Sequence, residues 1–385
     1  MIDRRSLLLA AAAHGALLLP GIGFARAETE RRLVVLLLRG ALDGLHAVVP
    51  YAEPAYMAAR RQLALSPGSP GSDGGAVKLD GLFALHASLA HTAALYARGE
   101  ALIVHAVASP YRGRSHFDGQ NILESGASRA YARRDGWIGR LLPLLSGGRA
   151  VAVAPALPLV LQGSPDVVSY VPSGSDDASE GLLERVGQLY DDDALLHGLW
   201  TEAMKIQGLA GDAGDGGRQL EQLATIAGRL LSDRRGPRIA VVESHGWDTH
   251  TNQVVRLARK LGTLDAAISA LETALGASWA DSLVLVVTEF GRTVETNGTG
   301  GTDHGTASAV LMAGGAVRGG RVVADWPGLA RPALFDGRDL RPTTDLHWLL
   351  AGVISDHFAL DPALAARSLF PGSRIGRAAS GLLRS

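Results

Sequence analysis

The feature that most constrains the fold is a set of uninterrupted apolar runs that each stop at a polar motif. Residues 283–287 (LVLVV) give way at once to Thr288, Glu289 and a glycine, and residues 32–38 (RLVVLLL) end in a glycine-containing segment. A strand buried on both faces of a parallel sheet is apolar without alternation. These runs therefore predict an α/β fold with a mostly parallel central sheet.

Acidic and imidazole side chains stand next to several of these runs. Open α/β sheets bind their ligands beyond the carboxyl ends of the strands. Carboxylate oxygen and imidazole nitrogen are ligands that divalent cations accept. The pattern therefore predicts a catalytic metal or acid/base site. Its members are Asp248 and His250 after residues 238–242, Glu289 after residues 283–287, and Asp303 and His304 before residues 307–315.

Two earlier motifs could join this site. Asp43 follows the run at residues 32–38, although an aspartate beside glycines is by itself typical of a turn or a helix N-cap. Ser115, His116 and Asp118 follow the run at residues 102–107, at the expected start of a helix. A helix N-terminus attracts anionic groups. Ser115 as an N-cap is compatible with a role in the site.

Composition excludes several kinds of protein. The 385 residues are enough for one large α/β domain or two smaller ones. A formal net charge of −1 gives no basic excess for nucleic acid or a membrane surface. The absence of cysteine excludes disulfides, thiolate zinc sites and a cysteine nucleophile.

Residues 1–27 are expected to be an export signal rather than part of the fold. Arg4 and Arg5 precede a short apolar stretch, and Ala25 and Ala27 form an A-x-A cleavage pattern. The paired arginines resemble a twin-arginine signal, which predicts the twin-arginine export machinery as a partner. An ordinary secretory peptide is the alternative. Either one predicts a periplasmic or secreted chain, and no later run is long enough for stable membrane insertion.

The middle of the chain changes in character. From residue 164 to residue 233, polar loops separate helical stretches that carry no clear site residues. We interpret residues 164–233 as a helical insertion that forms a cap beside the sheet. A long amphipathic helix over residues 254–275 then leads back to the run at residues 283–287.

Five motifs together resemble a known family. RGALDGL, SPYRGRSHFDGQ, GWDTHTNQ, VTEFGRT and GGTDHG occur in this order over nearly the whole chain after residue 27. They resemble DUF1501, a family of twin-arginine-exported, sulfatase-like proteins, and more loosely the alkaline phosphatase superfamily. The resemblance implies one alkaline phosphatase-like domain over residues 28–385, a three-layer α/β sandwich. It also implies a site for divalent ions, Zn²⁺ or else Mn²⁺, Mg²⁺ or Ca²⁺, two of them in the superfamily.

The resemblance also assigns ligands. Asp43 matches the N-terminal aspartate ligand, Asp248 with His250 matches an aspartate–histidine pair, and His304 matches a late histidine ligand. Glu289 matches the aspartate of an Asp-His-Gly motif. The sequence departs from that motif at Phe290, which stands where the superfamily has a histidine. His116, His46 or Asp303 could supply the missing ligand.

The implied function is metal-dependent hydrolysis of a small anionic phosphate or sulfate ester. Ser115 or His116 lies near the nucleophile position, and Arg292, or else Arg112 or Arg114, would hold the ester's oxygens. The alternative is a catalytically degenerate protein that binds a metal or an anion, or serves in assembly. An exported redox protein is less favoured, because the sequence has no dinucleotide, haem or iron–sulfur motif. The oligomeric state stays open.

Overall fold

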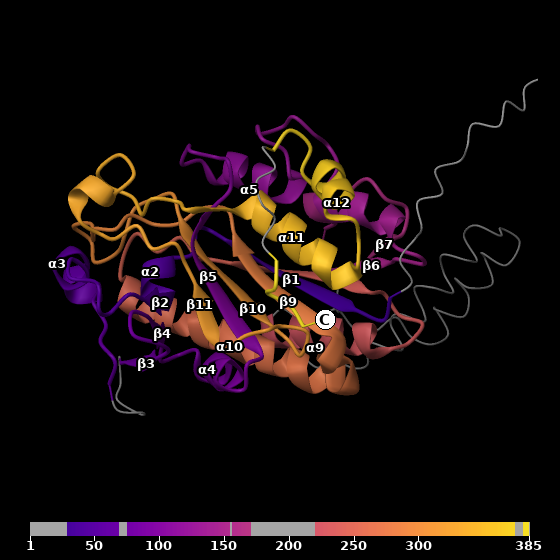
Figure 1. The fold of residues 1–385 in the computed structure, drawn as a ribbon, viewed down its shortest axis with the longest axis horizontal. Coiled ribbons are helices and arrows are strands. Elements are labelled where there is room, and N and C mark those ends of the chain that lie inside the picture. Colours follow the sequence, from indigo (N-terminus) through magenta and orange to yellow (C-terminus); the bar gives the residue numbers. More distant parts are fainter. Residues whose placement is uncertain (1–28, 69–74, 155, 171–219, 374–379, 385) are drawn as a thin grey trace, which may run out of the picture.

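A mixed sheet lies at the centre of the molecule (Figure 1). The computed structural model describes residues 29–68, 75–154, 156–170, 220–373 and 380–384, so the expected export signal lies outside it. Within these residues the sheet has nine strands, in the order β11-β5-β10-β9-β1-β8-β6-β7, with β12 also paired to β5. The strands are β1 (Arg32–Arg39), β5 (Ala101–Ala108), β6 (Ala150–Val153), β7 (Val167–Tyr170), β8 (Ile239–His245), β9 (Ser282–Thr288), β10 (Ser308–Ala313), β11 (Arg321–Val323) and β12 (Thr344–Asp345).

The apolar runs form the middle of this sheet, as predicted. β1 pairs in parallel with β8 on one side and β9 on the other. Successive residues of β1 face opposite sides: Val34 and Leu36 belong to one core, and Leu33 and Val35 to the other. All four are fully buried. An unbroken apolar run is thus what a strand with helices on both faces requires.

Helices cover both faces, which gives the expected three-layer sandwich (Figure 1). One core joins the sheet to α4, α9 and α10, and the other joins it to α6, α11 and α12. Helix α5 lies on the same side as α11 and α12. The helices of the two layers are α4 (Ala90–Ala97), α9 (Leu220–Ser232), α10 (Gln253–Leu275), α5 (His116–Ser125), α6 (Trp137–Leu141), α11 (Leu346–Phe358) and α12 (Pro362–Leu369).

Shorter elements complete the fold. A small antiparallel sheet has the order β2-β4-β3. Its strands are β2 (Val48–Val49), β3 (Ala76–Lys78) and β4 (Ala84–His86); the short helices are α2 (Gly44–Ala47) and α3 (Tyr56–Arg60), and 3₁₀ turns span Arg61–Leu63, Leu142–Leu144, Leu159–Leu161, Gly276–Asp281 and Arg331–Ala333. The apolar residues 159–161 form a 3₁₀ turn rather than a strand, with Pro158 as the N-cap. The last long helix begins at Leu346, after its N-cap Asp345.

The region expected to be a helical insertion, residues 164–233, is described only at its ends. Residues 171–219 lie outside the described part of the chain. The two described ends join the sandwich: β7 extends the sheet in parallel beyond β6, and α9 packs on α10 and β8. The first described residues of this range therefore belong to the sheet, and the last belong to one of its helical layers.

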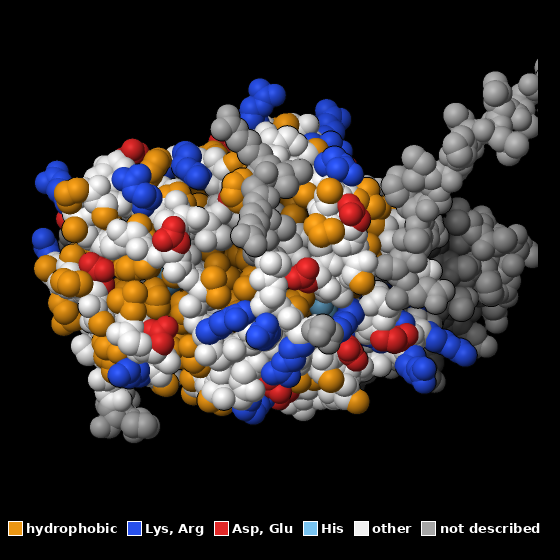
Figure 2. Space-filling view, viewed as in Figure 1, with side chains coloured by type: hydrophobic (Ala, Val, Ile, Leu, Met, Phe, Trp, Pro, Cys, Tyr) orange, Lys and Arg blue, Asp and Glu red, His pale blue; other side chains and the backbone are white. Residues whose placement is uncertain are grey.

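The surface carries charges of both signs. On the face seen in Figure 2, basic and acidic side chains are interspersed among apolar ones. This mixture agrees with the near-zero net charge of the sequence. Among the described helices, none is both long enough and apolar enough to span a bilayer.

Candidate metal centre

Four predicted site residues meet at the carboxyl edge of the sheet. His304 Nε2 lies 3.0 Å from His116 Nε2, 2.9 Å from His250 Nε2 and 3.2 Å from Asp248 Oδ1. His116 is the first residue of α5, Asp248 and His250 follow β8, and His304 precedes β10. Parallel strands end at one edge of a sheet, which brings groups distant in sequence together.

The partners of the three rings assign their protons. Nδ1 of His304 lies 2.8 Å from the carbonyl oxygen of Arg114, which can only accept, so Nδ1 carries the hydrogen. Nδ1 of His116 faces Glu289 at 2.8 Å, and Nδ1 of His250 faces Asp303 at 3.1 Å. The carboxylates are ionised, because their pKa values are below the ordinary range. Each Nδ1 therefore donates, and Nε2 carries the lone pair of each ring when that ring is neutral.

This arrangement fits a cation. Three imidazole lone pairs and a carboxylate converge, and they repel one another unless a proton or a metal ion lies between them. Ligand atoms of His116, Asp248 and His304 all lie within 4.8 Å of one another, and His250 stands beside them. Imidazole and carboxylate donors suit Zn²⁺ and neighbouring divalent ions. Among the described residues, this is the one group with such spacing, so a second ion has no matching group there.

Charges around the cluster are balanced by Arg292. Its Nη1 donates to Asp248 Oδ1, while Nε and Nη2 donate to the side chain and carbonyl of Thr302. Burial favours the neutral form of Asp248, yet the ion pair with Arg292 keeps the pKa of that carboxyl below its ordinary value. Arg292 is fully buried and uses its donors on the protein. Arg292 therefore supports Asp248, and its role in holding substrate oxygens stays a prediction.

Glu289 orients His116. The Oε1 of Glu289 accepts from His116 Nδ1, from Gln120 Nε2 at 3.2 Å and from the backbone N–H of Gly40 at 2.8 Å. The hydrogen bond to Glu289 raises the pKa of His116. A side chain at Gly40 would collide with the backbone of Asp248. Glu289 thus fixes the ring of His116 by a hydrogen bond at Nδ1. Glu289 was predicted to be a direct metal ligand, and in the structure His116 lies between it and the other ligand atoms.

Phe290 supports the same imidazole. Its ring stacks on that of His116 with centroids 5.0 Å apart. A side chain at Gly119 would come within 2.9 Å of the Phe290 ring, so glycine lets α5 approach. Of the three candidates to replace the missing histidine, His116 is the one in the cluster, where its Nδ1 faces Glu289 and its Nε2 faces His304. Its role as a nucleophile stays a prediction.

Asp43 is placed differently from its prediction as a ligand. It caps α2 and accepts from the N–H of His46, and its Oδ2 accepts from Arg60 and Gln253. Asp43 and Arg60 are both buried. Both carboxylate oxygens thus have protein donors, and the N-cap expected from the motif alone is what the structure has.

The other predicted residues lie around the cluster. Ser115 caps α5, with its Oγ 3.4 Å from the N–H of Asp118. Asp303 supports His250 rather than joining the cluster, and the amide of Asn297 lies 3.2 Å from its carboxylate. The sequence interpretation missed Gln120 and Asn297. Gln120 had a signal, because it lies one helical turn after His116.

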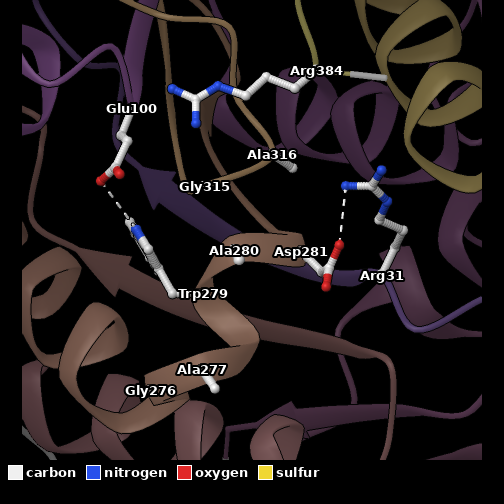
Figure 3. Close-up of a pocket in the computed structure, with 10 residues that line it drawn as sticks. All are labelled: Arg31, Glu100, Gly276, Ala277, Trp279, Ala280, Asp281, Gly315, Ala316 and Arg384. Atoms are coloured by element: carbon white, nitrogen blue, oxygen red, sulfur yellow. Dashed lines mark hydrogen bonds and ion pairs between the residues drawn. The ribbon is translucent and has the colours of Figure 1, made fainter.

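A cavity lies at the opposite edge of the sheet. Its volume is about 540 Å³, and Arg31, Trp279 and Asp281 are among the residues that line it (Figure 3). Arg31 pairs with Asp281 at 3.3 Å, and Trp279 donates to Glu100 at 3.3 Å. None of the predicted site residues lines this cavity, so its size does not make it the catalytic centre.

Residues 181–365 match the model of a family described as "Protein of unknown function (DUF1501)". The resemblance to DUF1501 is confirmed over this segment. The DUF1501 match includes Asp248, His250, Glu289 and His304, whereas His116 lies before it. No curated protein matches the sequence.

Solved structures show weaker likeness. Ps i-CgsB in complex with k-i-k-neocarrahexaose is 10% identical (74% of this chain, 66% of that chain, TM-score 0.36). Phosphonate monoester hydrolase of Agrobacterium radiobacter is 11% identical (86% of this chain, 74% of that chain, TM-score 0.36). A protein in the alkaline phosphatase superfamily from Vibrio parahaemolyticus is 14% identical (78% of this chain, 64% of that chain, TM-score 0.38). The chain spans slightly less than two thirds of the length of Ps i-CgsB and of the Vibrio parahaemolyticus protein. Because these TM-scores lie below 0.5, the residues of the site decide what the chain can do.

Proposed function

We propose that this chain is a metal-dependent hydrolase of phosphate or sulfate esters. His116, Asp248 and His304 would hold the ion, with His250 beside them. The observation that carries the proposal is the convergence of the Nε2 atoms of His116, His250 and His304 around the carboxylate of Asp248. A bound divalent cation would polarise an ester oxygen and lower the pKa of a coordinated hydroxyl.

The chain's own groups would prepare the site. The acceptors at each Nδ1 fix the rings, so the ligand atoms are arranged before an ion binds. Ser115 is the proposed nucleophile, because its Oγ lies at the positive end of α5, where negative charge is favoured. Its Oγ would bond to phosphorus or sulfur as the bond to the leaving oxygen breaks, and water would then cleave the bond to Oγ and release phosphate or sulfate. The hydroxyl proton would go to solvent, and the leaving alkoxide would take one up.

Metal content tests the ligands. After reconstitution with Zn²⁺ or Mn²⁺, elemental analysis should find metal in the wild-type protein and little or none in Asp248→Asn and in His304→Ala, because each variant loses a proposed ligand. His245→Ala is the matched control, because His245 is 70% exposed at the end of β8. Full metal content in both site variants would remove Asp248 and His304 from the site.

Turnover tests the reaction. The metal-loaded protein should cleave a chromogenic phosphate or sulfate ester, and Ser115→Ala should lose that activity while it retains metal. Full activity in Ser115→Ala would exclude Ser115 as the nucleophile. Activity that is the same with and without metal would exclude the metal-dependent mechanism.

A second candidate function is metal or anion binding without turnover. Two observations favour it: the Ser115 hydroxyl already accepts from the helix backbone, and Arg292 is enclosed by the protein. A protein that binds metal but cleaves none of the phosphate or sulfate esters would support this second function. Cleavage would exclude it.

Export through the twin-arginine machinery is part of the proposal. Arg4 and Arg5 before the apolar stretch support it. Replacing both by lysine should stop accumulation of the chain outside the cytoplasm, measured by cell fractionation. Arg26→Lys, in the same segment, is the control and should leave export unchanged. Normal export of the double variant would favour an ordinary secretory signal.

A further inference from the structure

Two partly exposed arginines contact His304, Arg114 through its backbone carbonyl and Arg338 through its guanidinium. The carbonyl of Arg114 accepts from His304 Nδ1 at 2.8 Å, and Nη2 of Arg338 donates to the carbonyl of His304. Their side chains are 41% and 40% exposed. Both arginines therefore adjoin a proposed metal ligand and reach solvent.

One buried carboxylate holds both arginines. Asp339 is fully buried; its Oδ2 lies 3.3 Å from Nη2 of Arg114, and its Oδ1 lies 2.8 Å from Nε of Arg338. Thr306 donates to Asp339 Oδ2 at 2.9 Å. Fixing long side chains in advance reduces the entropy that they lose when a ligand binds. Two positive charges share the one negative charge of Asp339, so the two arginines together keep a net positive charge.

The two arginines also keep donors for a ligand. Within the described residues, Nε and Nη1 of Arg114 and Nη1 of Arg338 have no protein acceptor. Arg292 differs, since its guanidinium is enclosed and bonded to Asp248 and Thr302. Guanidinium groups match the oxygens of phosphate and sulfate in charge and geometry.

We infer that Arg114 and Arg338, held by Asp339, bind the tetrahedral oxyanion group of the substrate, a phosphate or a sulfate. The inference rests on the proposed function for the identity of the ester, but anion binding can be measured without turnover. The sequence interpretation named Arg114 as one candidate for this role and did not consider Arg338.

Calorimetric titration of inorganic phosphate, and separately of sulfate, into the metal-loaded protein tests the inference. Arg114→Gln and Arg338→Gln should each weaken binding roughly tenfold, and the double variant should weaken it further. Arg331→Gln is the matched control, since Arg331 is an exposed arginine nearby. Arg338→Lys should restore part of the affinity, and metal content should not change in any of them. If Arg338→Gln does not fold, the comparison of Arg338→Lys with wild type replaces it.

Equal anion binding by wild type and the double variant would overturn the inference, as would a wild type that binds neither anion. Arginine-dependent binding without ester cleavage would support the inference and count against the proposed function. Ester cleavage with a KM that the arginine variants leave unchanged would count against the inference and leave the function standing. Whichever anion binds more tightly identifies the ester class.

Discussion

Asp43 and Asp248 follow neighbouring strands at one edge of the sheet, each with a buried arginine, yet they do different things. Asp43 is 1% exposed, and its oxygens accept from a backbone N–H, from Arg60 and from Gln253. The Asp248 side chain is 39% exposed and is faced by imidazole nitrogens as well as by Arg292. Hydrogen-bond donors surround the Asp43 carboxylate, whereas most of the groups around the Asp248 carboxylate are imidazole nitrogens.

The difference shows how to tell a structural carboxylate from a metal ligand. Hydrogen-bond donors satisfy a buried carboxylate and leave no oxygen for an ion. Lone pairs gathered around a carboxylate repel one another and are stabilised by a cation. Residue type and position at a strand end are the same in both cases, so the partners decide.

Removing the charge of Asp43 should have the largest effect. Asp43→Asn leaves Arg60 as a buried, unmatched cation, and we expect the free energy of unfolding to fall by about 3–5 kcal/mol. Chemical denaturation measures this loss. Metal bound per folded molecule should stay at the wild-type value. Loss of metal without loss of stability would make Asp43 a ligand after all.

A double-mutant cycle sharpens this prediction. The variant Asp43→Asn/Arg60→Gln should be less destabilised than the sum of the two single variants, because neither charge is then left alone. Strict additivity would mean that the two side chains do not interact.

Removing the anchor of His116 should weaken metal binding less than removing a ligand. Glu289→Ala deletes the acceptor at Nδ1, and we expect metal affinity to fall about 10–100-fold. Glu289→Gln, whose amide oxygen can still accept, should lose less. Glu295→Gln, a nearby exposed carboxylate, is the control for competition titrations with a chelator. An affinity in Glu289→Ala equal to that of the control would show that His116 needs no anchor.

The imidazole beside Asp43 should affect acid stability. His46 is buried without a protein partner for either ring nitrogen among the described residues, and burial lowers its pKa from 6.5 to about 3; Arg60 and His86 act in the same direction, and Asp43 opposes them. The unfolded chain then binds more protons between these values, so stability falls as the pH drops from about 6.5 towards 3. His46→Phe should flatten this decline by one proton, about 1.4 kcal/mol per pH unit.

Denaturation at pH 4–6.5 measures that slope. His245→Phe alters an exposed histidine and should leave the slope unchanged. An unchanged slope in His46→Phe as well would show that His46 is protonated in the folded protein.

The sequence predicted the sheet and most of the cluster for one reason. Unbroken apolar runs identify buried strands, and groups that follow parallel strands come to one edge of the sheet, as His116 after β5 and His250 after β8 do. The direction of β10 was not predictable, because an apolar run reads alike in parallel and antiparallel strands; β10 is antiparallel to both neighbours. The sequence also does not show which charged side chains pair with one another, because Arg60 lies 17 residues after Asp43 and Asp339 lies 225 residues after Arg114.

The smallest predicted effect concerns the ring that supports His116. Phe290→Leu keeps an apolar side chain but loses the flat stacking surface, worth about 0.5–1.5 kcal/mol for an aromatic pair. Metal affinity should fall by roughly two- to tenfold.

Phe370→Leu provides the matched control for this substitution. Phe370 stacks in the same way on His347, with ring centroids 4.8 Å apart, and neither residue is one of the proposed metal ligands. The Phe370→Leu variant should lose stability, measured by denaturation, and keep its metal affinity, measured by competition with a chelator. If both variants lost metal affinity equally, general loosening of the fold would account for the effect. If only Phe290→Leu lost metal affinity, Phe290 would act by holding the ring of His116.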